Sequence, residues 1–463
     1  MAYATTNPYT GETLKTFPNA TDEDVSLALN QADTAFHQWK LTSISDRVKV
    51  LKKAADLLRA RHTEYAKFLT LEMGKLLSEA EAEVELSAAI FEYYVEHAEQ
   101  QLAPEKLPSK DPAVTEAWLV HEPLGIILAI EPWNFPYYQI ARIIAPQLAA
   151  GNVLVLKHAS NVPQSADLFE KLMLEAGLPV GGFRNIYATR KQIETIINDP
   201  RVHGVALTGS EGAGAVVASQ AGKALKKSTM ELGGADAFLV LEDADLDKAA
   251  RWAVFGRHWN AGQVCCSSKR LIVIEAIYEA FIERYIAGVA ALKAGDPLDP
   301  ETSLAPLSSQ GAADDVRRQV EEAVAHGASA TVIGSEVPAR GAFVRPVMLT
   351  NLTKENPAYY QEFFGPISLV FKAKDETEAI QIANDSPFGL GGSVFTQDIE
   401  RGKRVARQIS TGMVYINHPT AVKADLPFGG IRRSGYGREL IGLGLKEFVN
   451  HKLIGVTDID GNF

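Results

Sequence analysis

The sequence predicts an α/β protein with two sheet-containing domains in tandem. Its 463 residues exceed what one ordinary core accommodates, so roughly two to four domains are expected. Short apolar runs alternate with helical stretches of about 10 to 20 residues, which is typical of a parallel sheet covered on both faces. A second series of the same kind follows the first. We therefore expect two doubly wound, Rossmann-like domains.

The N-terminal third is predicted to be mainly helical. Apolar residues between Thr21 and Lys40 recur on one helical face, and Thr21 with Asp24 has the spacing of a capping box. Helical patterns continue through residues 46–75 and 79–100, where charged residues occupy the exposed faces. We expect these helices to have a structural role.

The predicted sheets follow a Pro-rich connection at residues 103–112. Strands of the first series are expected at GIILAI (125–130), NVLVLK (152–157), RNIYA (184–188), GVALTG (204–209) and AFLVL (237–241). Strands of the second series are expected at RLIVIE (270–275), ATVIG (330–334), ISLVFK (367–372), GGSVFT (391–396) and GMVYIN (412–417). The boundary between the two series falls near Gly233 to Leu241.

Composition narrows the function classes. Hydrophobic residues (46%) and charged residues (22%) are close to globular averages, which argues against disordered and fibrous classes. The net charge of -11 is spread along the chain, which disfavours a nucleic acid or an anionic membrane as a partner and favours small molecules. No apolar run reaches the roughly 18 residues of a membrane span, and no signal segment is recognisable, so we expect a cytoplasmic protein.

Cysteine and histidine usage argues against disulfide and metal frameworks. The two cysteines are adjacent and are expected to be reduced, because they could close only a strained ring. The ten histidines are scattered without metal-ligand spacing, so no metal site is expected.

Two segments carry polar groups where strands are expected to end. Residues 204–225 have the pattern of a strand, a Gly/Ser turn and a helix, which suits a pyrophosphate but also an ordinary turn. In EPWNFP (131–136), the amide of Asn134 suits an oxyanion or a simple turn. Arg142 interrupts an apolar helical pattern and needs a partner, either a structural carboxylate or a substrate anion.

Two further segments carry a carboxylate and a thiol. Glu231 precedes a Gly-Gly pair and could be a general base if burial raises its pKa, or a surface charge. In NAGQVCCSSK (260–269), Cys265 could supply a nucleophilic thiolate or fill space as a small hydrophobe. We expect Cys266 to pack rather than react, although a reversible bond that protects its neighbour stays an alternative.

Together, these motifs resemble the NAD(P)-dependent aldehyde dehydrogenase superfamily over almost the whole chain. The motifs that carry the resemblance occur in family order and at about the family spacing: PWNFP (132–136), NVLVLK (152–157), LTGS (207–210), ELGG (231–234), NAGQVC (260–265), EFFGP (362–366), PFGG (427–430) and SGYGRE (434–439). Within the superfamily, the chain is most similar to the bacterial succinate-semialdehyde dehydrogenases.

The resemblance implies catalytic roles for three residues. Cys265 would attack the aldehyde carbonyl to form a thiohemiacetal. Asn134 and the backbone N–H of Cys265 would hold its oxyanion. Hydride transfer to the nicotinamide would leave a thioester, and Glu231 would activate the water that releases the acid.

The resemblance also implies a binding site for NADP or NAD. Lys157 would bond the adenosine ribose, and the pyrophosphate would lie at Gly209 and Ser210. Glu362 and Phe364 would contact the nicotinamide ribose and ring. The remaining residues assigned to this site are Trp133, Ser160, Leu232 and Gly233.

Ser160 makes the sequence compatible with NADP. Many NAD-preferring members have a glutamate at this position, and its charge would repel the 2′-phosphate of NADP. A serine would not repel the phosphate.

The resemblance places Arg142, Trp259 and Phe428 around the substrate, with Trp133 as a further wall. Arg142 lies where similar enzymes contact a substrate carboxylate, which favours succinate semialdehyde. Trp259 replaces a second carboxylate-binding arginine of some members, so another aliphatic or aromatic aldehyde stays open. The sequence also leaves open a CoA-acylating enzyme, which Glu231 disfavours, and a binding protein without activity.

The family architecture implies three structural units. Residues 1–112 and 131–233 would form the dinucleotide-binding domain, and residues 234–440 the catalytic domain. Residues 113–130 and 441–463 would form a small β arm for oligomerisation, which predicts a homodimer or a homotetramer.

Overall fold

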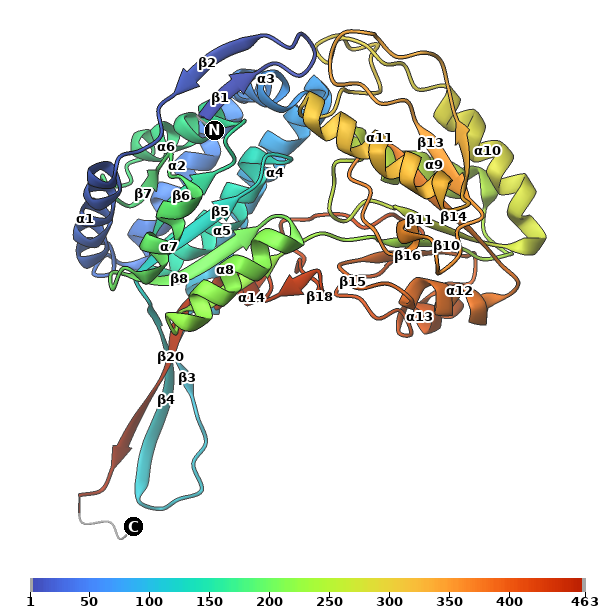
Figure 1. Ribbon diagram of the computed structural model, residues 1–463. Coiled ribbons are helices and arrows are strands. Elements are labelled where there is room, and N and C mark those ends of the chain that lie inside the picture. Colours follow the sequence, from blue (N-terminus) through green and yellow to red (C-terminus); the bar gives the residue numbers. More distant parts are fainter. Residues whose placement is uncertain (1–2, 460–463) are drawn as a thin grey trace.

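The computed structural model describes residues 3–459 and contains two large sheets, each covered by helices, from which a narrow β arm projects (Figure 1). The predicted fold class, two doubly wound α/β units with a β arm, is confirmed. The end of the predicted arm, residues 460–463, lies outside the described residues. Within residues 3–459, no helix is both long enough and apolar enough to cross a membrane.

The first sheet has six strands in the order β19-β9-β8-β5-β6-β7, and all of its pairs are parallel except β19 with β9. Its strands are β5 (Ile126–Glu131), β6 (Val153–His158), β7 (Phe183–Asn185), β8 (Val202–Thr208), β9 (Lys227–Glu231) and β19 (Gly435–Tyr436). The helices of this half are α1 (Asp22–Trp39), α2 (Ile44–Ala60), α3 (His62–Met73), α4 (Leu77–Gln101), α5 (Pro136–Ala150), α6 (Pro163–Glu175), α7 (Arg190–Asn198), α8 (Glu211–Lys223) and α14 (Ile441–Leu445).

The capping box predicted at the first helix is present. Thr21 accepts a hydrogen bond from the backbone N–H of Asp24 (3.1 Å), and the Asp24 carboxylate accepts one from the backbone N–H of Thr21 (2.9 Å). These bonds satisfy two backbone donors that would otherwise lack partners at the start of α1.

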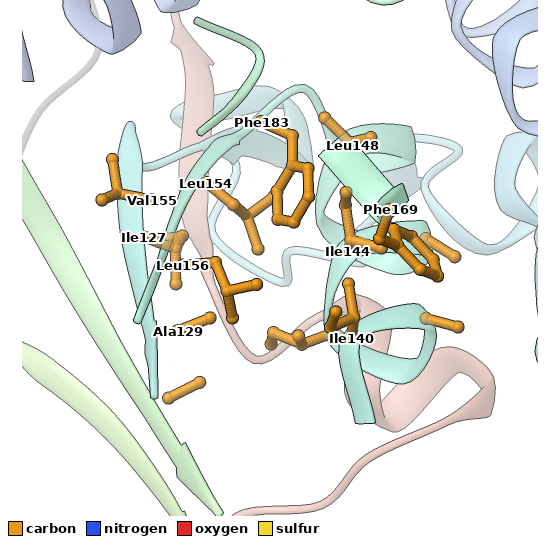
Figure 2. Close-up of a cluster of buried hydrophobic side chains, with 14 of the residues drawn as sticks. Ile127, Ala129, Ile140, Ile144, Leu148, Leu154, Val155, Leu156, Phe169 and Phe183 are labelled. Atoms are coloured by element: carbon orange, nitrogen blue, oxygen red, sulfur yellow. The ribbon is translucent and has the colours of Figure 1, made fainter. Parts of the chain in front are cut away.

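A buried apolar cluster fixes α5 against the first sheet. Figure 2 shows Ile127 of β5 and Leu156 of β6 in the same cluster as Ile140 and Ile144 of α5. All four side chains are fully buried, and each contributes about 1.5–3 kcal/mol through burial. The packing holds the start of α5 at the carboxyl end of β5, where ligands bind in open α/β sheets.

The second sheet has seven strands in the order β12-β13-β14-β11-β10-β16-β17, of which β12 alone is antiparallel to its neighbour. Its strands are β10 (Ala237–Val240), β11 (Arg270–Ile274), β12 (Ser329–Val332), β13 (Val347–Thr350), β14 (Ile367–Ala373), β16 (Gly392–Phe395) and β17 (Tyr415–Ile416). The helices of this half are α9 (Leu246–His258), α10 (Tyr278–Ala290), α11 (Gln310–Ala325), α12 (Glu376–Asn384) and α13 (Ile399–Ala406), with short 3₁₀ segments η1 (Trp259–Gly262), η2 (Glu275–Ile277) and η3 (Pro357–Tyr359).

The arm is a three-stranded antiparallel sheet that reaches away from both halves (Figure 1). It consists of β20 (Val449–Thr457), β4 (Val114–Pro123) and β3 (Glu105–Lys106). Two small pairs complete the fold: β1 (Tyr3–Thr6) with β2 (Thr13–Phe17), and β15 (Phe388–Gly389) with β18 (Ile431–Arg432).

Strand pairing differs from the predicted units or from the predicted strand series at three places. Residues 126–130, expected in the arm, belong to β5 in the first sheet. The run AFLVL, expected to end the first series, supplies β10 of the second sheet. Gly435 and Tyr436, expected in the catalytic domain, form β19 and pair with β9 in the first sheet. Apolar runs mark strands but do not say which strand each one pairs with.

Candidate active site

Residues 264–266, which include both cysteines, form part of the wall of a cavity of about 640 Å³. The lining comes from α4, α5, the end of α9, residues 264–266 and residues 418–428. Cys265 and the three predicted substrate residues line it: Arg142, Trp259 and Phe428. Several aromatic rings belong to the lining, and among them Trp259 stacks on Phe255 with ring centroids 6.0 Å apart. Trp133 is not part of the lining and packs edge-on against Phe364 at 5.7 Å.

Three consecutive left-handed residues lead into the cysteine turn. Asn260 (φ 51°), Ala261 (φ 53°) and Gly262 (φ 78°) all have positive φ. This conformation costs a residue other than glycine about 1–2 kcal/mol. At Gly262, an added Cβ would lie 2.3 Å from the Gly365 carbonyl oxygen, so no side chain fits there.

Hydrogen bonds from α4 and from the PWNFP loop hold this strained turn. The Glu79 carboxylate accepts a hydrogen bond from the backbone N–H of Asn260 (2.8 Å). The Asn260 side-chain amide donates to the Asn134 carbonyl (3.0 Å), and the Asn134 amide donates to the Gln263 carbonyl (3.0 Å). The turn is therefore bonded both to α4 and to the loop that precedes α5. Conformational strain of this kind persists where the surrounding structure over-determines it, as at functional sites.

The two cysteines have different environments. Cys265 is partly exposed, whereas the Cys266 side chain is buried, with 2% of its surface accessible. The backbone there forms a turn rather than an extended strand. The Cys266 thiol lowers the pKa of Cys265, and the positive charges of Lys269 and Arg142 lower it further against the opposing effect of burial. A lowered pKa increases the thiolate fraction that a nucleophile needs.

Lys269 anchors the backbone carbonyl groups around Cys265. Its ammonium is fully buried and donates to the carbonyls of Val264 (2.6 Å) and Cys265 (2.7 Å). It also forms an ion pair with Glu362 at 3.0 Å. These contacts orient the Cys265 peptide group and bring a positive charge near the thiol.

Glu231 ends β9 and is buried among charged groups. Its exposure is 2%, and neither carboxyl oxygen has a hydrogen-bond partner within residues 3–459. Burial raises the pKa of Glu231 well above its usual value, Glu439 raises it further, and Arg142 opposes the rise. An added Cβ at Gly429 would lie 2.6 Å from a Glu231 oxygen, so only glycine leaves space for this carboxyl group. Such a group has the raised pKa that a general base for water requires.

Arg142 has protein partners on every nitrogen. Its Nε forms an ion pair with Glu439, Nη1 donates to the Tyr138 hydroxyl (3.0 Å), and Nη2 donates to the Thr208 hydroxyl (2.7 Å). Its side chain is 1% exposed. The structural carboxylate that the sequence left open as a partner is thus Glu439. Its contact with a substrate carboxylate stays a prediction, for which two N–H groups of the guanidinium remain.

The residues assigned to the adenosine and phosphate groups lie at the carboxyl ends of β6 and β8. Lys157 is near the end of β6, and burial lowers its pKa to about 8, with a smaller contribution from the charge of Arg190. Ser160 follows in the next loop. Ser210 caps α8 through a 3.4 Å hydrogen bond from the backbone N–H of Ala213, and Gly209 precedes it. Free N–H groups at a helix start suit a pyrophosphate.

The residues assigned to the nicotinamide side lie close together. The Glu362 carboxylate accepts a hydrogen bond from the backbone N–H of Gly234 (3.0 Å). An added Cβ at Gly233 would lie 2.1 Å from a Glu362 oxygen. Leu232 is buried, and its backbone N–H donates to the Ser434 carbonyl (3.0 Å). Phe364 contacts Trp133, as described above, so this set forms one side of the candidate cofactor site.

Sequence reasoning assigned no role to several residues that shape this site. Glu439 was part of the SGYGRE motif, which was the only signal that could have drawn attention to it. The local sequence predicts only the start of a strand at Lys269 and only the start of a helix at Glu79. The role of Glu79 depends on its contact with Asn260, 181 positions away in the sequence, whereas Lys269 bonds the carbonyls of two residues that shortly precede it.

Comparison with known proteins gives consistent matches along the chain. The sequence profile of the aldehyde dehydrogenase family matches residues 1–454. The succinate-semialdehyde dehydrogenase [NADP(+)] of Deinococcus radiodurans is 46% identical over 452 residues, which cover 98% of this chain and 94% of the relative. The Mycobacterium ulcerans protein named succinate-semialdehyde dehydrogenase [NADP(+)] 1 is 43% identical over 457 residues, which cover 98% of this chain and 100% of the relative.

The solved structures extend this similarity to the fold. The succinic semialdehyde dehydrogenase of Streptococcus pyogenes, in complex with NADP+ as the cofactor, matches with a TM-score of 0.96 and 46% identity. The match covers 99% of this chain and 100% of that chain.

Proposed function

Because the chain belongs to the aldehyde dehydrogenase family, we propose that it oxidises a semialdehyde to the carboxylic acid with NADP and water. The proposal is supported by Cys265, Asn134 and Glu231, which come from three segments: Asn134 bonds the Gln263 carbonyl near Cys265, and Cys265 acts on the pKa of Glu231. A partly exposed thiol with a lowered pKa, an amide donor and a buried carboxyl with a raised pKa are what acyl transfer to water needs.

The first step is carried by Cys265 and Asn134. The Cys265 thiolate attacks the aldehyde carbon, and the carbonyl oxygen becomes an oxyanion in the thiohemiacetal. Because Asn134 uses one amide hydrogen on the Gln263 carbonyl, its second hydrogen is available to this oxyanion. Bound NADP supplies the hydride acceptor that turns the thiohemiacetal into a thioester.

The second step is carried by Glu231. Its ionised carboxylate takes a proton from water, and the resulting hydroxide attacks the thioester carbon. The bond to the Cys265 sulfur breaks, and the acid is released. Glu231 also argues against a CoA-acylating enzyme, which has no need for a base that activates water.

The residues present fit a cofactor with a 2′-phosphate. The Lys157 ammonium and the Arg190 guanidinium are close enough for one charge to lower the pKa of the other, and Ser160 adds a neutral hydroxyl. A phosphate group would relieve this repulsion, because it supplies the missing negative charge. The names of the relatives also contain NADP.

For the aldehyde, succinate semialdehyde is the first candidate, because the relatives described above carry its name. A neutral aliphatic or aromatic aldehyde is the second candidate. The aromatic lining of the cavity favours it, as does the engagement of Arg142 with Glu439.

We further propose that the enzyme is a homodimer or homotetramer held together through its arm, and that it acts in the cytoplasm. The arm leaves Leu453, Ile454 and Val456 exposed on both faces of β20, which suits burial by a second copy. A reducing compartment would keep the free Cys265 and Cys266 thiols reduced.

The test is a steady-state panel of succinate semialdehyde, butanal and benzaldehyde, each with NADP and with NAD. The expected result is acid and NADPH in equal amounts without CoA, and the highest kcat/KM for succinate semialdehyde with NADP. A higher kcat/KM for the neutral aldehydes would replace the first candidate by the second. Absence of reduced cofactor with every pair would refute the proposed function.

A further inference from the structure

The buried ammonium of Lys269 lies against the backbone that carries Cys265. It donates to the Val264 carbonyl (2.6 Å) and to the Cys265 carbonyl (2.7 Å), and it forms an ion pair with Glu362 at 3.0 Å. The side chain of Lys269 has no exposed surface. An ammonium has three N–H bonds, and three protein oxygens contact this one. Lys269 therefore has no donor left for a ligand, and its effect on the chemistry has to pass through its partners.

The first of these partners belongs to the peptide group that also carries the N–H of Cys265. The Val264 carbonyl and the Cys265 N–H are the two ends of one peptide bond, which is trans. Because a trans peptide group is planar, its N–H points in the direction opposite to its carbonyl. The bond from Lys269 to the Val264 oxygen therefore fixes the direction of the Cys265 N–H, which points away from the ammonium.

This peptide group is bonded at its oxygen and free at its nitrogen. The Val264 carbonyl also accepts a hydrogen bond from the backbone N–H of Ser267 (3.2 Å), whereas the Cys265 N–H has no acceptor of ordinary geometry within residues 3–459. Residues 264–266 form part of the cavity wall. Buried backbone N–H groups are almost always paired, so an unpaired one in a cavity wall indicates a donor that serves a ligand.

A charged donor on the carbonyl also strengthens the N–H at the other end of the peptide group. Hydrogen bonds in a chain polarise one another, and those from an ionised donor are the strong ones. The Lys269 ammonium draws electron density toward the Val264 oxygen, which makes the Cys265 N–H more positive. Donors that are fixed in direction before the reaction are the ones that stabilise an oxyanion most.

Glu362 and Gly234 keep the ammonium in place. The Glu362 carboxylate, which pairs with Lys269, also accepts a hydrogen bond from the backbone N–H of Gly234 (3.0 Å). An added Cβ at Gly234 would lie 2.6 Å from the Cys265 carbonyl oxygen, so only glycine allows this close approach. The ammonium is therefore held between Glu362 and the two carbonyls.

We infer that Lys269 is a positioning residue for the oxyanion: through the Val264 carbonyl, it aims and polarises the Cys265 N–H that receives the carbonyl oxygen of the substrate. The inference rests on the proposed function, in which Cys265 forms a thiohemiacetal. Lys269 itself does not touch the substrate. It sets the strength of the backbone donor, which acts beside the side-chain amide of Asn134.

Lys269 also acts on the thiol, and the experiment has to separate the two effects. The Cys266 thiol lowers the pKa of Cys265 most, burial opposes this, Lys269 and Arg142 lower it further, and Glu362 raises it. Loss of the Lys269 charge therefore moves thiolate formation to higher pH. At a pH where all of the thiol is ionised, this effect disappears, whereas a weakened oxyanion donor still slows the reaction.

The test compares two reactions of Cys265 without cofactor, each followed across pH up to its plateau. In acylation by p-nitrophenyl acetate, the thiolate attacks the ester carbon through an oxyanion, p-nitrophenolate leaves and a thioester forms. In alkylation by iodoacetamide, the thiolate displaces iodide and no oxyanion forms. Release of p-nitrophenolate measures the first rate, and peptide mass mapping of alkylated Cys265 measures the second.

In Lys269→Met, the plateau rate of acylation is expected to fall by about tenfold, less than the roughly 10²–10³-fold loss that follows removal of a whole oxyanion donor. The plateau rate of alkylation should stay within about twofold of the unmodified protein, because it depends on the thiolate alone.

Two further variants complete the comparison. Lys269→Gln keeps a neutral amide donor, so it should lose less acylation than Lys269→Met, and it answers the question if Lys269→Met does not fold. Ser268→Ala is the matched control, because it changes a buried neighbour and leaves the three contacts of Lys269 in place. Both of its plateau rates should equal those of the unmodified protein.

An unchanged acylation plateau in the Lys269 variants that fold would overturn the inference. Equal losses of acylation and alkylation would also overturn it, because Lys269 would then only hold the thiol in place. If the unmodified protein is acylated by the ester but forms no NADPH from any aldehyde, the proposed function is wrong, and the ratio of the two plateau rates still decides the role of Lys269.

Discussion

The Asn134 side-chain amide donates a 3.0 Å hydrogen bond to the backbone carbonyl of Gln263, two residues before the proposed nucleophile Cys265. The proposed oxyanion donor and the thiol are therefore joined through the protein before any substrate arrives. Pre-organised donors of this kind act on charge that develops in the transition state, and they need no rearrangement during the reaction.

Asn134→Ala is expected to slow hydride transfer by about 10²–10³-fold, because it removes a donor to the oxyanion. The burst rate in stopped-flow experiments measures this step. Asn134→Asp is the matched control for size. It should lose a similar factor because a carboxylate repels the oxyanion, whereas an unchanged burst in either variant would exclude Asn134 from the oxyanion site.

Cys265→Ala is expected to abolish aldehyde oxidation while NADP still binds, because the thiol forms the covalent intermediate. Cys266→Ala is expected to keep most of the activity. It should move the pH dependence of the burst upward, since the Cys266 thiol lowers the pKa of Cys265. Burst kinetics and trapping with iodoacetamide across pH measure both effects. Loss of oxidation in Cys266→Ala alone would reverse the assignment.

NADP affinity is expected to weaken as the pH rises above about 8, because the Lys157 ammonium then loses its proton. The same group affects folding. Its usual pKa is 10.5, so between about pH 8 and 10.5 the unfolded chain binds more protons, and the Lys157 contribution to the free energy of unfolding rises with pH. Fluorescence titration with NADP from pH 7 to 9.5 measures the affinity. The Lys157→Arg variant stays charged, so its NADP affinity should not change with pH over this range. If the affinity of the variant and of the unmodified enzyme fell in parallel with pH, the role of Lys157 would be contradicted.

Glu79→Ala is expected to lower kcat by about 10- to 100-fold, because the left-handed turn at Asn260 loses its hydrogen-bond acceptor and the thiol is misplaced. Glu79→Gln retains an acceptor oxygen and should remain within about threefold of the unmodified enzyme. The affinity for NADP should not change in either variant, and its measurement serves as the control. Equal losses in both variants would mean that the charge of Glu79, rather than its bond to Asn260, matters.

Leu453→Lys combined with Ile454→Lys is expected to shift the protein toward a monomer, because both side chains are exposed on β20 in the single chain. Sedimentation velocity measures the oligomeric state. Lys452→Gln is the control on the same strand, since it loses only the exposed ion pair with Glu122. An unchanged sedimentation coefficient in the double variant would place the subunit contact elsewhere.

Much of the fold followed from local patterns. Continuous apolar runs predicted β5, β6, β8, β11, β14 and β16, because strands buried on both faces need them. The pairing partners did not follow, since β9 joins β19 from a segment far away in the chain. The choice of partner depends on where helices such as α5 place each strand in space.

The sequence by itself determined the family, and it proposed roles for the thiol, the amide and the carboxyl group, because acyl transfer requires these side chains in recognisable motifs. Only the tertiary structure decided the state of those groups. The sequence left open whether the partner of Arg142 is a structural carboxylate or a substrate anion, and the pairing with Glu439 arises only when the C-terminal segment packs against α5. Burial and neighbouring charges set proton affinities, and both are properties of the folded arrangement rather than of any local stretch of sequence.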